Sequence, residues 1–228
     1  MPYVKRMVCL ANSYKAPDGR CIAGREVLRD GFGAWIRPVS ARETAEISFW
    51  ECQYEDRTIP RLLDIIDVRL VRPEPRHHQT ENHIIAAGRW AKAGELPWKR
   101  LAELLDHPAS LWINIDSTSA GANDRMSQSE AATVTHSLML IRPERFCVAV
   151  GRNDQTGRRN FRGDFSYNGM RHNLSVTDPI VRDVFGLKEE GRYPLNDVYL
   201  CVSLTEPYEH DGKCYKLVAA VLSERPLG

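Results

Sequence analysis

The chain opens with VKRMVCLA at residues 4–11, RCIAGREVL at 20–28 and AWIRPV at 34–39, three strand-length runs separated by Gly and Asp. This is the spacing of a strand meander. A fourth run, LLDIIDVRLV at 62–71, is dense in β-branched residues and is stopped by Pro73 and Pro75. Four or five strands within about 75 residues are what a small β-barrel needs. The opening segment therefore predicts one such barrel.

A second set of strand-length runs begins near residue 133. It comprises residues 133–142, 145–151, 160–167, 170–176, 197–205 and 213–222, with a turn at 210–212 before the last run. A short helix is predicted from Asp178 to Phe185, because Asp178 followed by Pro179 is typical of a helix N-cap with proline at the first helical position. The chain is thus predicted to be mainly β, with a first barrel over residues 1–76 and a second over 132–228.

Residues 77–131 have a different pattern and are predicted to connect the barrels. Only residues 98–106 (WKRLAELLD) indicate a helix, with Trp98, Leu101, Leu104 and Leu105 on one face. The stretch from 117 to 129 is rich in small and polar residues and predicts a mobile loop.

The composition is that of an ordinary folded protein, with 43% hydrophobic and 27% charged residues. The net charge of +1 excludes a strongly polybasic protein but is compatible with a local basic face. The six cysteines are scattered without metal-site spacing, so we expect free thiols and no metal. The start shows no signal-peptide pattern, and no run approaches the roughly 20 apolar residues of a membrane span, so we expect a cytoplasmic location and no membrane contact.

Several segments carry a family resemblance that spans Cys9 to Leu222. They are CLANSYK (9–15), GRCIAGREV (19–27), GAWIRPVS (33–40), LSVTDP (174–179), LCVSLTEP (200–207) and CYKLVAAVL (214–222). Together they resemble a family of bacterial proteins described as dual OB-containing domains (DuOB-like). The resemblance implies two OB-like barrels and, by analogy with that fold, binding of nucleic acid or oligonucleotides. It implies no reaction.

The richest candidate site is the stretch 152–173, where arginines alternate with aromatic residues. The predicted nucleic-acid-binding residues in it are Arg158, Arg159, Arg162, Tyr167 and Arg171. Arginines neutralise phosphates and aromatic rings stack on unpaired bases, so the mixture suits single strands. Phe161, Phe165 and Tyr167 share one strand face. Phe161 and Phe165 are more typical of core residues, whereas Tyr167, beside the Asn168–Gly169 turn, is expected to be exposed.

The first half offers a smaller candidate. Its members are Asn12, Ser13, Lys15 and Arg20 in a predicted loop, and Trp35 and Arg37 on a following strand. Short polar side chains and a lysine can hold a phosphate, and a guanidinium can bond it through two N–H groups or stack on a base. The alternative is that Asn12 and Ser13 only fix a turn and that Trp35 is buried.

An enzymatic reading remains open but is less favoured. His77, His78 and His83 cluster near Glu81, although adjacent histidines point to opposite sides of a strand and the upstream prolines favour a solvated loop over a metal site. Other candidates are Cys21 with Glu26, Asp178 and Glu206, of which the last two are better explained as a helix cap and a strand end. No Walker, GxSxG, HExxH or GxGxxG signature is present.

Three hypotheses follow. The first is a binding module without cofactor that holds single-stranded nucleic acid or a nucleotide in a groove shared by the barrels, as part of a bacterial defence or toxin-linked system. The second is an enzyme acting on a nucleotide or nucleic acid in a cleft between the barrels. The third is an interaction subunit that binds a protein from the same operon. The first is favoured, and its arginines are expected to make the second half the more sensitive to mutation.

Overall fold

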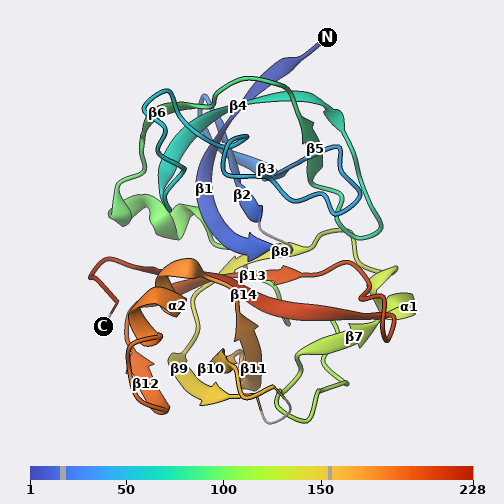
Figure 1. Ribbon diagram of the computed structural model, residues 1–228, viewed down its shortest axis with the longest axis vertical. Coiled ribbons are helices and arrows are strands. Elements are labelled where there is room, and N and C mark those ends of the chain that lie inside the picture. Colours follow the sequence, from blue (N-terminus) through green and yellow to red (C-terminus); the bar gives the residue numbers. More distant parts are fainter. Residues whose placement is uncertain (16–18, 154–155, 228) are drawn as a thin grey trace. The chain divides into compact units, whose positions relative to one another are not determined.

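The computed structural model describes residues 1–15, 19–153 and 156–227. The chain divides into two compact units, Met1–Leu105 and Asp106–Gly228. Each unit has its own β-sheet and its own hydrophobic core, and helices contribute little to either. The protein is therefore mainly β, and the prediction of two strand-rich barrels is confirmed (Figure 1).

The first unit is a five-stranded barrel with one additional strand. Its strands are β1 (Tyr3–Lys15), β2 (Gly19–Leu28), β3 (Gly31–Val39), β4 (Asp64–Pro73), β5 (Asn82–Ile85) and β6 (Ala91–Glu95). The order is β1-β2-β3-β5-β4, and β4 pairs back onto β1, which closes the circuit. The β3–β5 pair is parallel and the other pairs are antiparallel. Strand β6 extends the sheet from β4 and leads to the 3₁₀ helix η1 (Trp98–Leu104).

The length of β1 explains how this barrel closes. Its first half pairs with β4 and its second half with β2, and a register shift between Cys9 and Ala11 bends the strand. Gly24 lies opposite Cys9, where a Cβ atom would stand 1.9 Å from the Val8 carbonyl oxygen, so a side chain has no room there. The core consists of inward side chains that are almost completely buried, among them Met7, Cys9, Ile22, Ile36, Ile66, Val68, Leu70 and Trp90.

The second unit repeats the same circuit with a helix inserted. Its elements are β7 (Arg125–Ser127), α1 (Gln128–Ala131), β8 (Leu138–Ile141), β9 (Arg145–Arg152), β10 (Arg159–Tyr167), β11 (Met170–Val176), α2 (Pro179–Phe185), β12 (Gly191–Leu195), β13 (Val198–Leu204) and β14 (Lys213–Ser223). The order is β12-β9-β10-β11-β14-β13-β8, with β7 on the other side of β14. Strand β11 runs parallel to β14, and β9, β10 and β11 form an antiparallel meander.

Strands β12 and β13 together act as one interrupted strand. Only residues 196–197 separate them, and Asp197 there has a positive φ of 51°. Strand β12 pairs with β9 while β13 pairs with β14, so this one segment closes the barrel. Both units thus have the circuit 1-2-3-5-4-1 of an OB barrel, and α2 follows the third strand of the second.

The sequence patterns that define α2 and the second core are confirmed. The Asp178 side chain accepts a hydrogen bond from the Ile180 amide at 2.8 Å, and Pro179 occupies the first turn. Phe161 and Phe165 are buried, at 8% and 1% exposure, as the alternation favours. Between them Gly163 leaves room for Phe146, whose ring would lie 2.8 Å from an added Cβ atom.

The predicted barrel boundaries and connector need correction. The division between the units follows Leu105, because β5, β6 and η1 complete the first unit and residues from 106 onward pack with the second. The stretch from 117 to 129 is also more structured than the expected mobile loop. It contains β7 and the start of α1, and both Asp124 carboxylate oxygens accept hydrogen bonds from Thr118, at 2.7 and 2.6 Å. Polar residues in this segment therefore serve local hydrogen bonding.

No helix among residues 1–15, 19–153 and 156–227 is long and apolar enough to cross a membrane.

Candidate nucleic-acid interface

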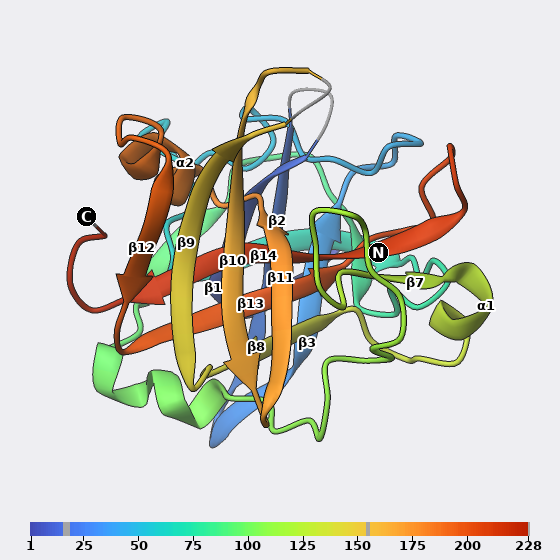
Figure 2. The same cartoon turned by 90° about the horizontal axis from the view of Figure 1, so that it is seen from below.

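Strands β12, β9, β10 and β11 of the second unit lie side by side in this order (Figure 2). Their outer face is polar. Side chains alternate along each strand, so the residues between the buried ones point outward. Phe146, Val148, Phe165 and Leu174 belong to the core. The outward residues include Arg145, Cys147, Arg162, Asp164, Arg171 and Arg192, and the strand pairings place them on one continuous surface.

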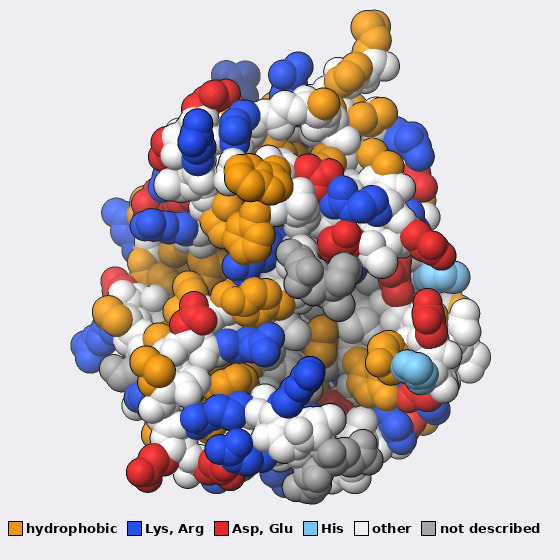
Figure 3. Space-filling view, viewed as in Figure 1, with side chains coloured by type: hydrophobic (Ala, Val, Ile, Leu, Met, Phe, Trp, Pro, Cys, Tyr) orange, Lys and Arg blue, Asp and Glu red, His pale blue; other side chains and the backbone are white. Residues whose placement is uncertain are grey.

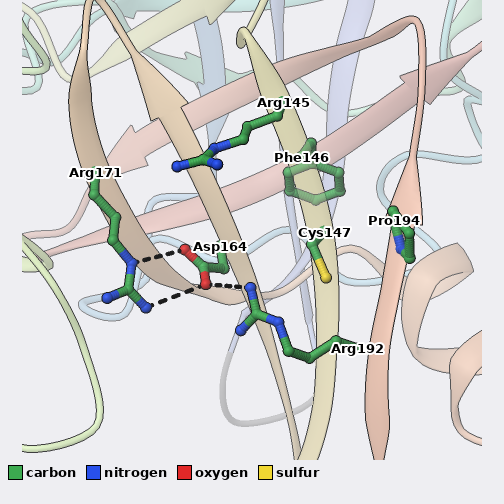
Figure 4. Close-up of a pocket in the computed structure, with 7 residues that line it drawn as sticks. All are labelled: Arg145, Phe146, Cys147, Asp164, Arg171, Arg192 and Pro194. Carbon is green, nitrogen blue, oxygen red and sulfur yellow. Dashed lines mark hydrogen bonds and ion pairs between the residues drawn. The ribbon is translucent and has the colours of Figure 1, made fainter.

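Two arginines of this face bond one carboxylate, and a third lines the same depression (Figure 4). Arg171 donates to both Asp164 carboxylate oxygens, at 3.1 and 3.2 Å, and Arg192 donates to Oδ2 at 2.5 Å. Arg145 donates to the Ser166 hydroxyl at 3.1 Å. These residues line an open depression of about 460 Å³ whose remaining lining is Phe146, Cys147 and Pro194. We call Arg145, Arg171 and Arg192 the arginine triad.

The charges of the depression do not balance. Asp164 is 9% exposed, and burial alone would raise the pKa of its carboxyl group, but hydrogen bonds from Arg171 and Arg192 hold that pKa below its usual range. The same bonds raise the pKa of both arginines. Three positive charges therefore face one negative charge. The Arg171 and Arg192 side chains are 61% and 60% exposed, which leaves guanidinium N–H groups open to an anion from solvent.

The other arginines predicted from this stretch have different surroundings. Arg158 is exposed beside the β9–β10 turn, and Arg159 is half-buried and donates to the Lys188 carbonyl oxygen. Arg162 is 13% exposed and donates to Asp124, Asn173 and Ser175. Its donors are used within the unit, so its role in the structure is to hold the 117–124 segment against β10 and β11.

The expectation that Tyr167 is exposed was wrong. The side chain is 9% exposed, and its hydroxyl donates to the Pro108 carbonyl oxygen at 3.0 Å. Strand alternation directs it inward together with Phe161 and Phe165. None of these three rings is therefore a stacking platform.

The first-half candidate is also rearranged. Asn12, Ser13 and Lys15 lie within β1 and not in a loop, and Arg20 lies in β2. Asn12 donates to the Pro60 carbonyl oxygen at 2.7 Å, and Ser13 is buried. These contacts fit the structural alternative for Asn12 and Ser13.

The strand candidates of the first unit have separate environments. Arg37 was predicted to bind nucleic acid. It is 2% exposed and forms an ion pair of 3.3 Å with Glu81, so its guanidinium is not on an outer surface. Trp35 is half-buried, with the Arg25 guanidinium 5.8 Å from its ring centroid.

The catalytic candidates Cys21 and Glu26 have separate surroundings. Glu26 forms an ion pair with Lys5 at 2.7 Å, whereas Cys21 is half-buried elsewhere on β2. His77 is exposed, as expected for a residue of a solvated loop, whereas His78 is buried. Within the described part of the chain, no three His, Cys, Asp or Glu side chains are grouped as metal ligands.

Sequence reasoning missed Arg145 and Arg192. They lie on β9 and β12, outside the arginine-rich stretch. Strand pairing brings Arg145 opposite Ser166 and Arg192 opposite Ala149, so both line the same depression as Asp164. The alternation of side chains along a strand could have predicted both positions. Arg145 precedes the inward Phe146 and Arg192 precedes the half-buried Tyr193, so both arginines are expected to point outward.

The comparisons with known proteins agree with the topology of both units. No curated protein matches the chain. A family model described as a dual OB-containing domain matches residues 5–221, nearly the whole sequence, which includes every strand of the two circuits apart from the ends of β1 and β14. The chain belongs to the dual OB-containing domain family.

Proposed function

We propose that the protein binds single-stranded nucleic acid across the outer face of the second barrel, with backbone phosphates on the arginine triad. The observation that carries the proposal is the convergence of Arg145, Arg171 and Arg192 around a single carboxylate. OB barrels bind oligonucleotides through the face of their second and third strands and the flanking loops. In this barrel those strands are β10 and β11, which carry Asp164 and Arg171.

The chemistry of the triad suits phosphodiesters. A guanidinium presents parallel N–H donors that match two phosphate oxygens, and the excess of two positive charges over Asp164 attracts an anion. The depression is wide and open, as an extended backbone requires. Because the face is formed by a sheet and not by loops, the spacing of the arginines is fixed by strand pairing.

Base stacking is supplied in this proposal by the β13–β14 hairpin, since Phe161, Phe165 and Tyr167 are in the core. Tyr208 on that hairpin is 54% exposed, with its ring centroid 5.1 Å from that of His210. The hairpin joins the fourth and fifth strands of the barrel circuit, and the loop at this place takes part in binding in OB folds. An exposed aromatic pair there offers a sequence-tolerant stacking surface.

The test is fluorescence anisotropy with labelled 15-nucleotide oligothymidylate and oligouridylate. If the triad neutralises three phosphates, the logarithm of affinity falls with the logarithm of salt concentration with a slope near −2, which is roughly a 20-fold loss between 50 and 200 mM salt. The variant R145A/R171A/R192A is expected to lose most of this affinity and slope.

The matched control removes the same number of charges elsewhere. R6A/R72A/R100A replaces three arginines of the first unit that are paired with Asp67, Glu74 and Glu103 and are half or nearly half exposed. R171K/R192K keeps the charge beside Asp164 and guards against loss of fold. Absence of binding at low salt, or equal binding by the triad variant and the wild type, would refute the proposal.

A further inference from the structure

A buried arginine of the first unit lies between two aromatic rings near the start of β2. The Arg20 guanidinium carbon is 4.5 Å from the ring centroid of Tyr14 on β1 and 4.7 Å from that of Phe49, in the segment after β3. Tyr14 and Phe49 are each 40% exposed, and the adjacent Trp50 is 76% exposed. We call Tyr14, Arg20, Phe49 and Trp50 the Arg20 cluster. Figure 3 shows hydrophobic rings open at the surface of the first unit, next to basic side chains.

The exposed rings are carried by a well-fixed turn. Arg20 and Ile47 exchange backbone hydrogen bonds of 2.7 and 3.0 Å, which ties the segment to β2. The Glu51 carboxylate accepts hydrogen bonds from the Ser48 amide and hydroxyl, both at 2.8 Å, and from Arg42 at 3.0 and 2.6 Å. The Arg42 hydrogen bonds hold the pKa of Glu51 at about 2, so Glu51 is ionised and keeps these hydrogen bonds at neutral pH. The large, exposed Trp50 is thus presented in a defined position.

The Arg20 side chain has a buried hydrogen-bond donor without an acceptor among the described residues. The side chain is 7% exposed, and its Nε–H group is buried without an acceptor among the described residues. The described part of the chain also provides no carboxylate within ion-pair distance of Arg20. A desolvated cation with unused donors is stabilised by an incoming anion.

We propose that the Arg20 cluster holds one nucleotide of the bound strand, with the base stacked on Trp50 and Phe49 and the neighbouring phosphate paired with the Arg20 guanidinium. A nucleotide supplies both a π-face for the exposed rings and an anion for the cation, and a stacked base tolerates any sequence. The inference rests on the proposed function in that it needs a single-stranded ligand. It goes further by assigning a second contact to the first barrel, formed by residues distinct from the arginine triad.

The test uses the fluorescence of Trp50, which is the most exposed of the five tryptophans. The chain has five tryptophans, of which Trp90 and Trp112 are buried and Trp35 and Trp98 are half-buried. Titration with unlabelled 15-nucleotide oligothymidylate is expected to quench the emission of the wild type, and W50F is expected to lose most of that quenching. Trp50→Ala is expected to weaken affinity roughly 5- to 150-fold in the anisotropy assay, the range typical for loss of one base-stacking ring.

The control is Leu28→Ala, which removes a hydrophobic side chain that is 51% exposed in the same unit and is expected to leave affinity unchanged. Arg20→Gln is expected to reduce the salt dependence as well as the affinity, and circular dichroism checks that its barrel remains folded.

The possible results separate this inference from the proposed function. Binding that depends on the triad but shows no Trp50 quenching and no loss in Trp50→Ala would overturn the inference and leave the proposed function standing. Binding that depends on Trp50 but not on the triad would overturn the assignment of phosphates to the triad and support the inference. No binding by the wild type would overturn both. Self-association that is lost in Trp50→Ala, measured by sedimentation without any oligonucleotide effect, would assign the cluster to a protein contact and overturn the inference.

Discussion

Replacing Asp164 by Asn separates the proposed binding role of the outer face from its contribution to the stability of the barrel. The substitution removes the one carboxylate among the three arginines, so the local charge rises from +2 to +3. A phosphate about 6 Å from Asp164 is repelled by about 0.7 kcal/mol in a water-like dielectric. Under the proposed function, relief of that repulsion is expected to tighten oligonucleotide binding about threefold at low salt.

The same substitution is expected to lower stability. Asp164 accepts charged hydrogen bonds from Arg171 and Arg192, but both arginines are about 60% exposed, so solvent screening limits the loss to about 1 kcal/mol. Because the folded pKa of Asp164 is depressed, its stabilisation is present above the ordinary value of 3.8 and disappears as the pH falls through the lowered pKa. The stability difference between Asp164→Asn and the wild type is therefore expected at pH 7 and shrinks below pH 3.8.

The assays are anisotropy with labelled oligothymidylate and urea unfolding followed by circular dichroism. Asp197→Asn is the control, since it removes a carboxylate that is 87% exposed and paired with Arg142 at 3.2 Å at the β12–β13 break. It changes the net charge equally but not the depression. Weaker or unchanged binding by Asp164→Asn, or an equal gain by Asp197→Asn, would refute the assignment of phosphates to this face.

Three further substitutions test the second barrel itself. Phe165→Ala removes a ring that is 1% exposed and packs on Phe146, and is expected to cost about 3–5 kcal/mol in urea unfolding; a loss below 1 kcal/mol would contradict its place in the core. Asp178→Ala leaves the Ile180 and Val221 amides without their acceptor and is expected to cost about 2 kcal/mol or more, whereas Asp178→Asn keeps much of the capping; equal losses would argue against the cap. Burial lowers the pKa of His172 to about 4, so as the pH falls the unfolded chain takes up a proton before the folded chain does, and wild-type stability falls between pH 6.5 and 4. In unfolding measurements across this range, His172→Phe is expected to lack that part of the fall. Identical pH profiles of the two proteins would show that His172 is not held neutral.

Much of the fold could be predicted from local patterns. The strand-length runs around Met7, Ile36 and Val148 alternate or cluster as buried strands do, and they lie in β1, β3 and β9. The Asp178–Pro179 pair fixed the start of α2 because a helix cap depends only on neighbouring residues. The family resemblance, which the family model confirms, added the type of barrel.

The candidate site was predicted less well because it depends on long-range pairing. Arg192 reaches Asp164 only because β12 pairs with β9 and β9 with β10, and no local pattern contains that register. Tyr167 was misplaced since its hydroxyl partner, the Pro108 carbonyl, lies 59 residues earlier in the chain. Arg37 appeared suited to a surface, but Glu81 from a later segment makes its burial tolerable.

The division of β9 to β12 into inner and outer side chains has a consequence for the effect of substitutions. Phe146, Phe165 and Leu174 maintain the barrel from one side of the sheet, while Arg145, Asp164 and Arg171 occupy the other. Substitutions on the outer side alter charge without creating cavities in the core. The charge of this face can therefore change while the barrel core is kept, so the proposed phosphate contacts can be altered without loss of the fold.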